Sequence, residues 1–119
     1  MANVLIVDDD PDAIKLIATY VAKEGHAPLS AANTTEAKKA LVEDPTLIFL
    51  DIDLPGETGV MFAIRLRMQE KYKQIPIVFV TAYPERGDRL VKADPEKTEI
   101  ISKPFRKEQL VAALRKYCK

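Results

Sequence analysis

Four short apolar runs in this chain each end on a charged or hydroxyl-bearing residue, and this pattern restricts the fold more than any other feature. The runs cover residues 4–7, 47–50, 75–80 and 100–101, and they lead into Asp8-Asp9, Asp51, Thr81 and Ser102-Lys103. Runs rich in Val and Ile, separated by longer amphipathic stretches, are typical of a parallel sheet covered by helices on both faces. Ligands bind outside the carboxyl ends of the strands in such sheets, so we expect these polar residues to meet at one edge.

Length and composition fit a single globular domain. The chain has 119 residues, of which 47% are hydrophobic and 30% are charged. Its 18 basic and 18 acidic residues give a formal net charge of zero, so no strong field attracts nucleic acid or an anionic membrane surface. No apolar run is long enough to span a membrane, no signal peptide is visible, and the single cysteine, Cys118, cannot form an intrachain disulfide. We therefore expect one cytoplasmic domain over residues 1–119, with no output domain in this chain.

Local signals predict five strands alternating with four or five helices. Strands are expected near residues 3–7, 27–31, 46–50, 77–80 and 99–102. Helices are expected after Asp10-Pro11 and after Asn33, over residues 58–70 and 107–117, and briefly over 88–93. Met61, Ile64 and Met68 share one side of the third helix. This alternation predicts a doubly wound α/β domain.

The residues expected at the sheet edge have the chemistry of a phosphoryl-transfer site. Asp8, Asp9 and Asp51 supply carboxylate oxygens, which are the ligands that Mg²⁺ prefers, and no nearby His or Cys favours zinc. A carboxylate can also attack phosphorus and form an aspartyl-phosphate. Lys103 would then neutralise the added charge, and Thr81 would hydrogen-bond a phosphoryl oxygen.

Taken in order, these residues resemble the receiver domain of two-component response regulators over the whole chain. The resemblance rests on Asp8-Asp9, the string from Asp51 through Pro55-Gly56 to Gly59, Thr81-Ala82 and Lys103-Pro104-Phe105. It implies a flavodoxin-like fold with strand order 2-1-3-4-5. It also implies Mg²⁺-dependent transfer of a phosphoryl group to Asp51 from a phosphohistidine donor. The implied partners are a sensor histidine kinase or phosphotransfer protein, and a downstream effector protein or output domain.

The resemblance implies a role for each site residue. Asp51 is the phosphoacceptor; Asp9, Asp51 and the backbone carbonyl of Asp53 ligate magnesium directly, and Asp8 holds it partly through water. The side chain of Asp53 either orients an attacking water or is a solvated loop residue. Thr81 and Lys103 contact the phosphoryl group, and the peptide bond between Lys103 and Pro104 is expected to be cis.

One position departs from the family pattern. The family often has Tyr or Phe three residues before the lysine, where this chain has Ile100. Either the output depends on a smaller rearrangement of the fifth strand and its neighbouring helices, or another residue reports phosphorylation, with Tyr83 as a candidate.

Two other functions fit part of the pattern. The string Asp51-Ile52-Asp53 resembles the nucleophile of haloacid-dehalogenase-type phosphatases, which are enzymes. Against this, the acidic pair precedes the nucleophile, Pro55 stands where that family favours Thr or Val, and 119 residues leave little room for a cap domain. A pseudo-receiver, folded but not phosphorylated, would act only as a docking module, although the complete set of site residues argues against it. On the main interpretation the chain is a signalling switch and not an enzyme, catalysing only its own phosphorylation and dephosphorylation.

Overall fold

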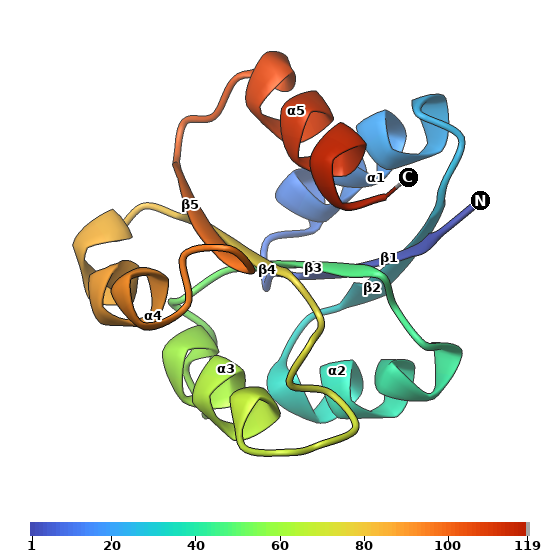
Figure 1. Ribbon diagram of the computed structural model, residues 1–119. Coiled ribbons are helices and arrows are strands. Elements are labelled where there is room, and N and C mark those ends of the chain that lie inside the picture. Colours follow the sequence, from blue (N-terminus) through green and yellow to red (C-terminus); the bar gives the residue numbers. More distant parts are fainter. Residues whose placement is uncertain (119) are drawn as a thin grey trace.

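Five parallel strands form one sheet in the order β2-β1-β3-β4-β5 (Figure 1). The computed structural model describes residues 1–118. The strands are β1 (Asn3–Val7), β2 (Ala27–Ala31), β3 (Leu47–Leu50), β4 (Ile77–Thr81) and β5 (Thr98–Ser102). Both the predicted class and the predicted strand order are confirmed, and the strand bounds agree with prediction to within one residue.

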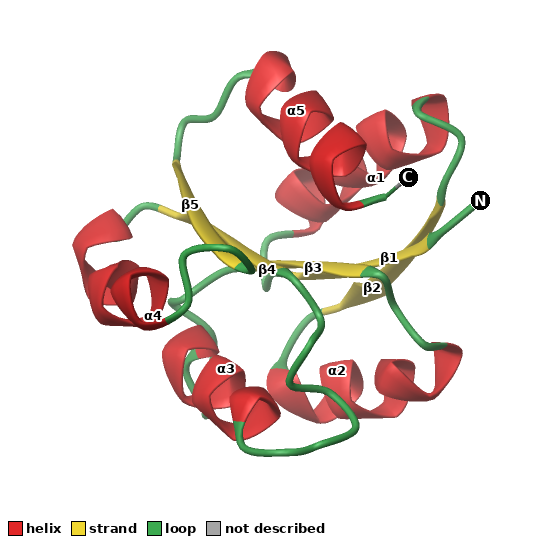
Figure 2. Ribbon diagram, in the orientation of Figure 1, coloured by secondary structure: helices red, strands yellow, loops and turns green. Residues whose placement is uncertain are grey.

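Helices cover both faces of the sheet (Figure 2). The helices α1 (Pro11–Lys23) and α5 (Lys107–Tyr117) lie on one face, and α2 (Thr34–Ala40), α3 (Gly59–Arg67) and α4 (Asp88–Ala93) lie on the other. Two short 3₁₀ turns, η1 (Leu41–Glu43) and η2 (Pro84–Gly87), follow α2 and precede α4. No helix in the described part of the chain is long and apolar enough to cross a membrane.

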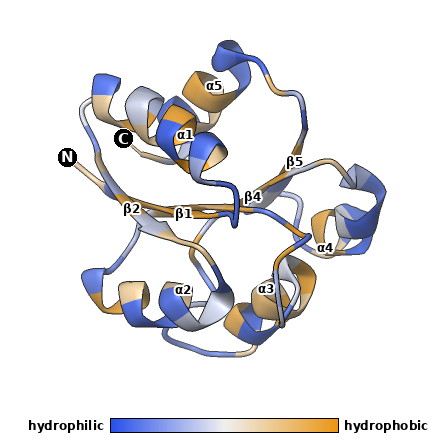
Figure 3. Cartoon of the chain, turned by 180° about the vertical axis from the view of Figure 1, so that it is seen from behind, coloured by the Kyte–Doolittle hydropathy of each residue, from blue (hydrophilic) through white to orange (hydrophobic). Residues whose placement is uncertain are grey.

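Alternate residues of each central strand supply two separate cores. In β1, Leu5 and Val7 pack with α2 and α3, while Val4 and Ile6 pack with α1 and α5. The central strands β3 and β4 are buried along their whole length. Figure 3 shows apolar residues along the sheet and more hydrophilic residues on the outer turns of the helices. Burial on both faces explains why these strands read as continuous apolar runs.

Side-chain caps fix where the helices begin. The Asp10 carboxylate accepts the Asp12 N–H at 3.0 Å, and the Asn33 side chain accepts the Glu36 N–H at 2.9 Å. Glu36 in turn accepts a hydrogen bond from the N–H of Ala32, one residue before the expected capping-box partner. Each bond satisfies an N–H that has no partner within the helix, so the predicted helix starts are confirmed.

The helix α3 differs from its prediction in extent. It ends at Arg67 and not near residue 70, where the backbone changes to a tighter turn in which the Gln69 N–H donates to the Leu66 carbonyl at 3.1 Å. The Arg67 guanidinium donates to the carbonyls of Lys73 and Ile75 at 3.3 and 2.7 Å. Those bonds hold the following turn back against the end of the helix.

The face that α3 buries also differs from the stripe seen in the sequence. The residues Phe62, Ala63 and Leu66 face the core, whereas Met61 and Met68 are 50% and 79% exposed.

Candidate functional site

The backbone brings the polar residues together at the carboxyl edge of the sheet, as predicted. Beyond the ends of the strands, the Asp51 N–H donates to the Val7 carbonyl at 2.9 Å, and the Lys103 N–H donates to the Thr81 carbonyl at 2.8 Å. These bonds continue the β1–β3 and β4–β5 ladders by one step. The residue that follows each strand is therefore held in register with its neighbour, and its side chain stands at the rim of the sheet.

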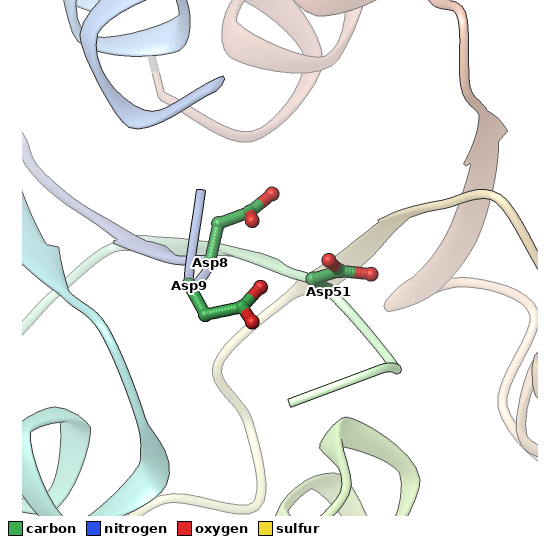
Figure 4. Close-up of side chains that lie close together, drawn as sticks. All are labelled: Asp8, Asp9 and Asp51. Atoms are coloured by element: carbon green, nitrogen blue, oxygen red, sulfur yellow. The ribbon is translucent and has the colours of Figure 1, made fainter. Parts of the chain in front are cut away.

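Three carboxylates meet at this rim. Asp8, Asp9 and Asp51 each offer a carboxylate oxygen, and these atoms all lie within 4.8 Å of one another. Figure 4 shows the Asp8 and Asp9 side chains, adjacent in sequence, both projecting toward the side on which Asp51 lies. Asp8 and Asp51 are 2% and 7% exposed, while Asp9 is exposed to solvent. The cluster therefore combines two sheltered carboxylates with one that faces water.

One ammonium group bridges the two sheltered carboxylates. The Nζ atom of Lys103 lies 2.7 Å from Asp8 Oδ2 and 3.2 Å from Asp51 Oδ2. Three carboxylates and one ammonium leave the site with a formal charge of −2. A partly buried site with that charge attracts a divalent cation.

Burial and the ion pair shift two pKa values in the site. Burial raises the pKa of Asp8, and the hydrogen bonds from Lys103 and from the Asp10 N–H offset this only in part. For Lys103, burial alone would lower the pKa, but the hydrogen bond and charge of Asp8, together with the charge of Asp51, raise it overall. The lysine therefore stays protonated across the physiological pH range.

A buried hydroxyl lies at the end of β4. Thr81 is fully buried, and its Oγ1 accepts a hydrogen bond from the Tyr83 N–H at 3.0 Å. The hydroxyl proton remains available to donate. Tyr83 is 37% exposed, and the Arg86 guanidinium lies 4.2 Å from the centre of its ring. Thr81 thus links the site to the segment that leads into α4.

Asp53 takes a different position from the other site acids. Its N–H points toward Asp51 Oδ1 at 3.4 Å, which is a long hydrogen bond, and its side chain is exposed. Its carboxylate is not a member of the three-carboxylate cluster. The peptide bond between Lys103 and Pro104 is cis, as expected.

Gly59, the last residue of the motif string that begins at Asp51, allows a close approach of two backbone segments. A Cβ atom at this position would lie 2.0 Å from the Asp51 carbonyl oxygen, far inside contact distance. The Gly59 N–H also donates to the Ile52 carbonyl at 2.9 Å. Gly59 therefore lets the first turn of α3 rest directly on the backbone of Asp51. Gly56, with φ of +77°, is the glycine that a turn requires.

Ile100 lies where the aromatic residue was expected. It is half-buried and packs against the core on the α3 side of the sheet. A Cβ atom at Gly87 would lie 3.1 Å from Ile100 Cδ1 and 3.2 Å from Phe79 Cδ2. The absence of a side chain at Gly87 thus gives Ile100 its place beside η2.

The family model of the response regulator receiver domain matches residues 4–115. The chain therefore belongs to the receiver domain family of two-component response regulators. This membership and the strand order favour the receiver interpretation over the phosphatase. The complete set of site residues, which the fold brings together, argues against a pseudo-receiver.

Similar proteins include several regulators with known names. The chain is 36% identical over 114 residues to the phosphate regulon transcriptional regulatory protein PhoB of Pseudomonas aeruginosa, and 31% identical to that of Escherichia coli. Each alignment covers 95% of this chain and 50% of the relative. The chain thus spans about half the length of the curated relatives it matches.

Solved structures with the same fold cover nearly the whole chain. The chemotaxis protein CheY4 of Vibrio cholerae has a TM-score of 0.85 at 31% identity, with 98% of both chains covered. The response regulator TrrA of Thermotoga maritima, in complex with Mg²⁺ and BeF, has a TM-score of 0.82 at 32% identity, with 98% of this chain and 99% of that chain covered.

Proposed function

We propose that residues 1–119 form a receiver domain in which Asp51 accepts a phosphoryl group from a phosphohistidine, in a reaction that requires Mg²⁺. The observation that carries this proposal is the Lys103 ammonium bridging Asp8 and Asp51 inside a cluster of three carboxylates. The donor would be a sensor histidine kinase or a phosphotransfer protein. Because the phosphoryl group of such donors derives from ATP, directly or through a kinase, a cytoplasmic location belongs to the proposal.

The donor set fits magnesium. Octahedral Mg²⁺ holds its oxygen ligands at about 2.1 Å, so neighbouring ligand oxygens are roughly 3 Å apart and opposite ones roughly 4 Å apart. The carboxylate oxygens of the cluster lie within 4.8 Å of one another, which small side-chain rotations can adjust. Asp9 and Asp51 would hold the ion directly with the Asp53 carbonyl, and Asp8 would hold it partly through water. When bound, the ion neutralises charge on the phosphoryl oxygens during transfer.

The chain's own residues account for the remaining chemistry. A carboxylate oxygen of Asp51 attacks phosphorus, the new P–O bond forms, and the P–N bond to the donor imidazole breaks with its electron pair staying on nitrogen. The Lys103 ammonium, which contacts the Asp51 carboxylate in the unphosphorylated protein, forms an ion pair with the negative charge of the phosphoryl group. The hydroxyl of Thr81 donates a hydrogen bond to a phosphoryl oxygen.

Thr81 also provides the path to the output. Its Oγ1 holds the Tyr83 N–H, so movement of the hydroxyl toward a phosphoryl group changes the position of η2 and α4. Phosphorylation would then shift an equilibrium between two arrangements of that surface, which an effector protein or an output domain distinguishes.

Labelling with a small phosphodonor tests the proposal. The protein is incubated with acetyl phosphate and Mg²⁺, and its intact mass and modified peptide are measured. We expect one added phosphoryl group on the parent protein and none on Asp51→Asn. The matched control is Asp12→Asn, because Asp12 is an exposed aspartate in the first turn of α1, outside the carboxylate cluster, and it should be labelled like the parent.

Full labelling of Asp51→Asn would contradict the assignment of the phosphoacceptor. Labelling that persists in EDTA would contradict the requirement for magnesium. Steady turnover of a generic phosphate ester would instead favour the phosphatase, and a folded parent protein that is never labelled would favour the pseudo-receiver.

A further inference from the structure

The loop between β3 and α3 carries a carboxylate that the proposed chemistry does not use. Glu57 lies in this loop, four positions after Asp53, and its side chain is 21% exposed. Its Oε2 accepts a hydrogen bond from the Arg65 guanidinium on α3 at 2.6 Å. Its Oε1 is buried and makes no hydrogen bond of ordinary geometry within the described chain, although the Thr34 hydroxyl of α2 is close. Arg65 is therefore the principal partner of this carboxylate.

The pair between Glu57 and Arg65 is more sheltered than an ordinary surface ion pair, which water screens. Burial alone would raise the pKa of Glu57, but the hydrogen bond and charge of Arg65 and the charge of Lys38 lower it below its ordinary value. The carboxylate is thus ionised at neutral pH. A sheltered charge that loses its partner moves toward water, because burying it unpaired is costly. Without Arg65, Glu57 would turn outward and pull on the loop.

The rest of the loop is tied near its two ends. The Leu54 N–H donates to the Ile52 carbonyl at 3.1 Å, and the Gly59 N–H donates to the same carbonyl at 2.9 Å. The residues at positions 55 and 56, between these ties, are exposed. The ion pair fastens this outer part of the loop to the second turn of α3. It therefore limits how far the loop can move away from the helix.

We propose that Glu57 and Arg65 are positioning residues for magnesium, because their ion pair restrains the loop that supplies the Asp53 carbonyl. This inference rests on the proposed function, in which that carbonyl ligates the ion. Partners that orient a metal ligand directly typically change metal affinity by about 10–100-fold. The pair acts on the carbonyl through several residues of loop, so we expect a smaller effect, of about three- to tenfold.

Two single variants separate positioning from a simple effect of charge. Glu57→Ala removes a negative charge and Arg65→Met removes a positive one, so electrostatics alone would weaken Mg²⁺ binding in the first and strengthen it in the second. Loss of positioning should instead raise the Kd for Mg²⁺ by about three- to tenfold in both, measured by isothermal titration calorimetry. The matched control is Lys73→Met, because Lys73 pairs with Glu70 at 2.9 Å and is 40% exposed, against 41% for Arg65. This control should bind Mg²⁺ like the parent to within about twofold.

A conservative replacement and a local measurement distinguish positioning from a general loss of stability. Arg65→Lys should keep the affinity of the parent to within about twofold, because one hydrogen bond joins Arg65 to Glu57 and a single ammonium can replace it. In metal-free Arg65→Met, hydrogen exchange at the Leu54 and Gly59 amides should be at least about tenfold faster, and exchange in β3 should rise much less.

Three results would overturn the positioning role. They are tighter Mg²⁺ binding by Arg65→Met, unchanged binding by both Arg65→Met and Glu57→Ala, and exchange in β3 that accelerates as much as exchange in the loop. A loss of affinity in Arg65→Lys as large as that in Arg65→Met would also count against it. A parent protein that binds no Mg²⁺ would instead refute the proposed function, and this inference with it.

Discussion

Replacing Lys103 with methionine tests whether the ammonium group competes with a cation for the three carboxylates. The Nζ atom lies 2.7 Å from Asp8 Oδ2 and 3.2 Å from Asp51 Oδ2. A Mg²⁺ ion held about 2.1 Å from the same carboxylates would lie roughly 4–5 Å from this group. The variant should therefore bind magnesium more tightly than the parent protein.

The size of the effect follows from Coulomb's law. A single and a double charge roughly 5 Å apart repel by about 1.7 kcal/mol in water, and by more at a partly buried site. Since about 1.4 kcal/mol is a factor of ten, the Kd for Mg²⁺ should fall at least about tenfold. The metal-free variant should also lose roughly 2–3 kcal/mol of unfolding free energy, between the values for exposed and buried pairs, because Asp8 loses its counter-charge.

Isothermal titration calorimetry at neutral pH and fixed ionic strength gives the Kd for both proteins. The matched control is Lys116→Met, because Lys116 pairs with Glu99 and its side chain is 56% exposed. The control should bind Mg²⁺ like the parent to within about twofold, a difference of less than about 0.5 kcal/mol. Unchanged or weaker binding by Lys103→Met would refute the reasoning, as would an equal gain in the control. Acetyl phosphate labelling should nevertheless slow, because the charge that stabilises the transferred group is missing.

Three further predictions concern stability and the integrity of the site. Gly59→Ala should lower the unfolding free energy by about 2–4 kcal/mol and weaken Mg²⁺ binding, because its Cβ would lie 2.0 Å from the Asp51 carbonyl; thermal melts with and without Mg²⁺ measure both effects. Burial alone would raise the pKa of Glu99, but hydrogen bonds from Lys116 and Tyr117 lower this pKa below 4.5. The stability that this group contributes is therefore present above pH 4.5 and is lost as the pH falls. Glu99→Gln should lower the unfolding free energy by less than about 1 kcal/mol at neutral pH. In urea unfolding, the variant should also lose less of its unfolding free energy than the parent protein as the pH falls below 4.5. Arg67→Met should lower the unfolding free energy in urea by about 2–4 kcal/mol, because its guanidinium donates to carbonyls of two separate turns at 2.7 and 3.0 Å. An unchanged urea midpoint would show that these bonds are dispensable.

The sequence was sufficient to predict the fold and the location of the site. Buried parallel strands appear as continuous apolar runs, and the next residue of each run lies at the carboxyl edge of the sheet. Three aspartates, a threonine and a lysine could therefore be assigned to one edge without knowledge of their contacts. Asp10-Pro11 and Asn33 likewise predicted helix starts, because capping depends on neighbouring residues only.

Features that depend on contacts between distant elements could not be predicted. The close approach of Gly59 to Asp51 depends on how α3 docks on the loop after β3, and a glycine in the sequence does not distinguish this from a turn. The same docking sets the rotation of α3, so that Phe62 and Leu66 are buried and Met61 is not. The segments held against the end of α3 depend on Arg67, whose acceptors lie far along the chain. A sequence signal for the close contact between α3 and the Asp51 backbone is a glycine at the first position of a helix. The helical backbone there does not need glycine, so the glycine indicates that there is no room for a side chain.

The ion pair between Lys103 and Asp8 joins positions that are 95 residues apart. During synthesis the aspartates emerge early, and their counter-charge follows only with the last strand, β5. A nascent chain that ends before β5 would therefore lack the lysine that the transferred phosphoryl group needs. On the proposed function, the order of the residues along the chain delays phosphorylation until most of the domain has been made, and we expect a product truncated before Lys103 not to be labelled by acetyl phosphate.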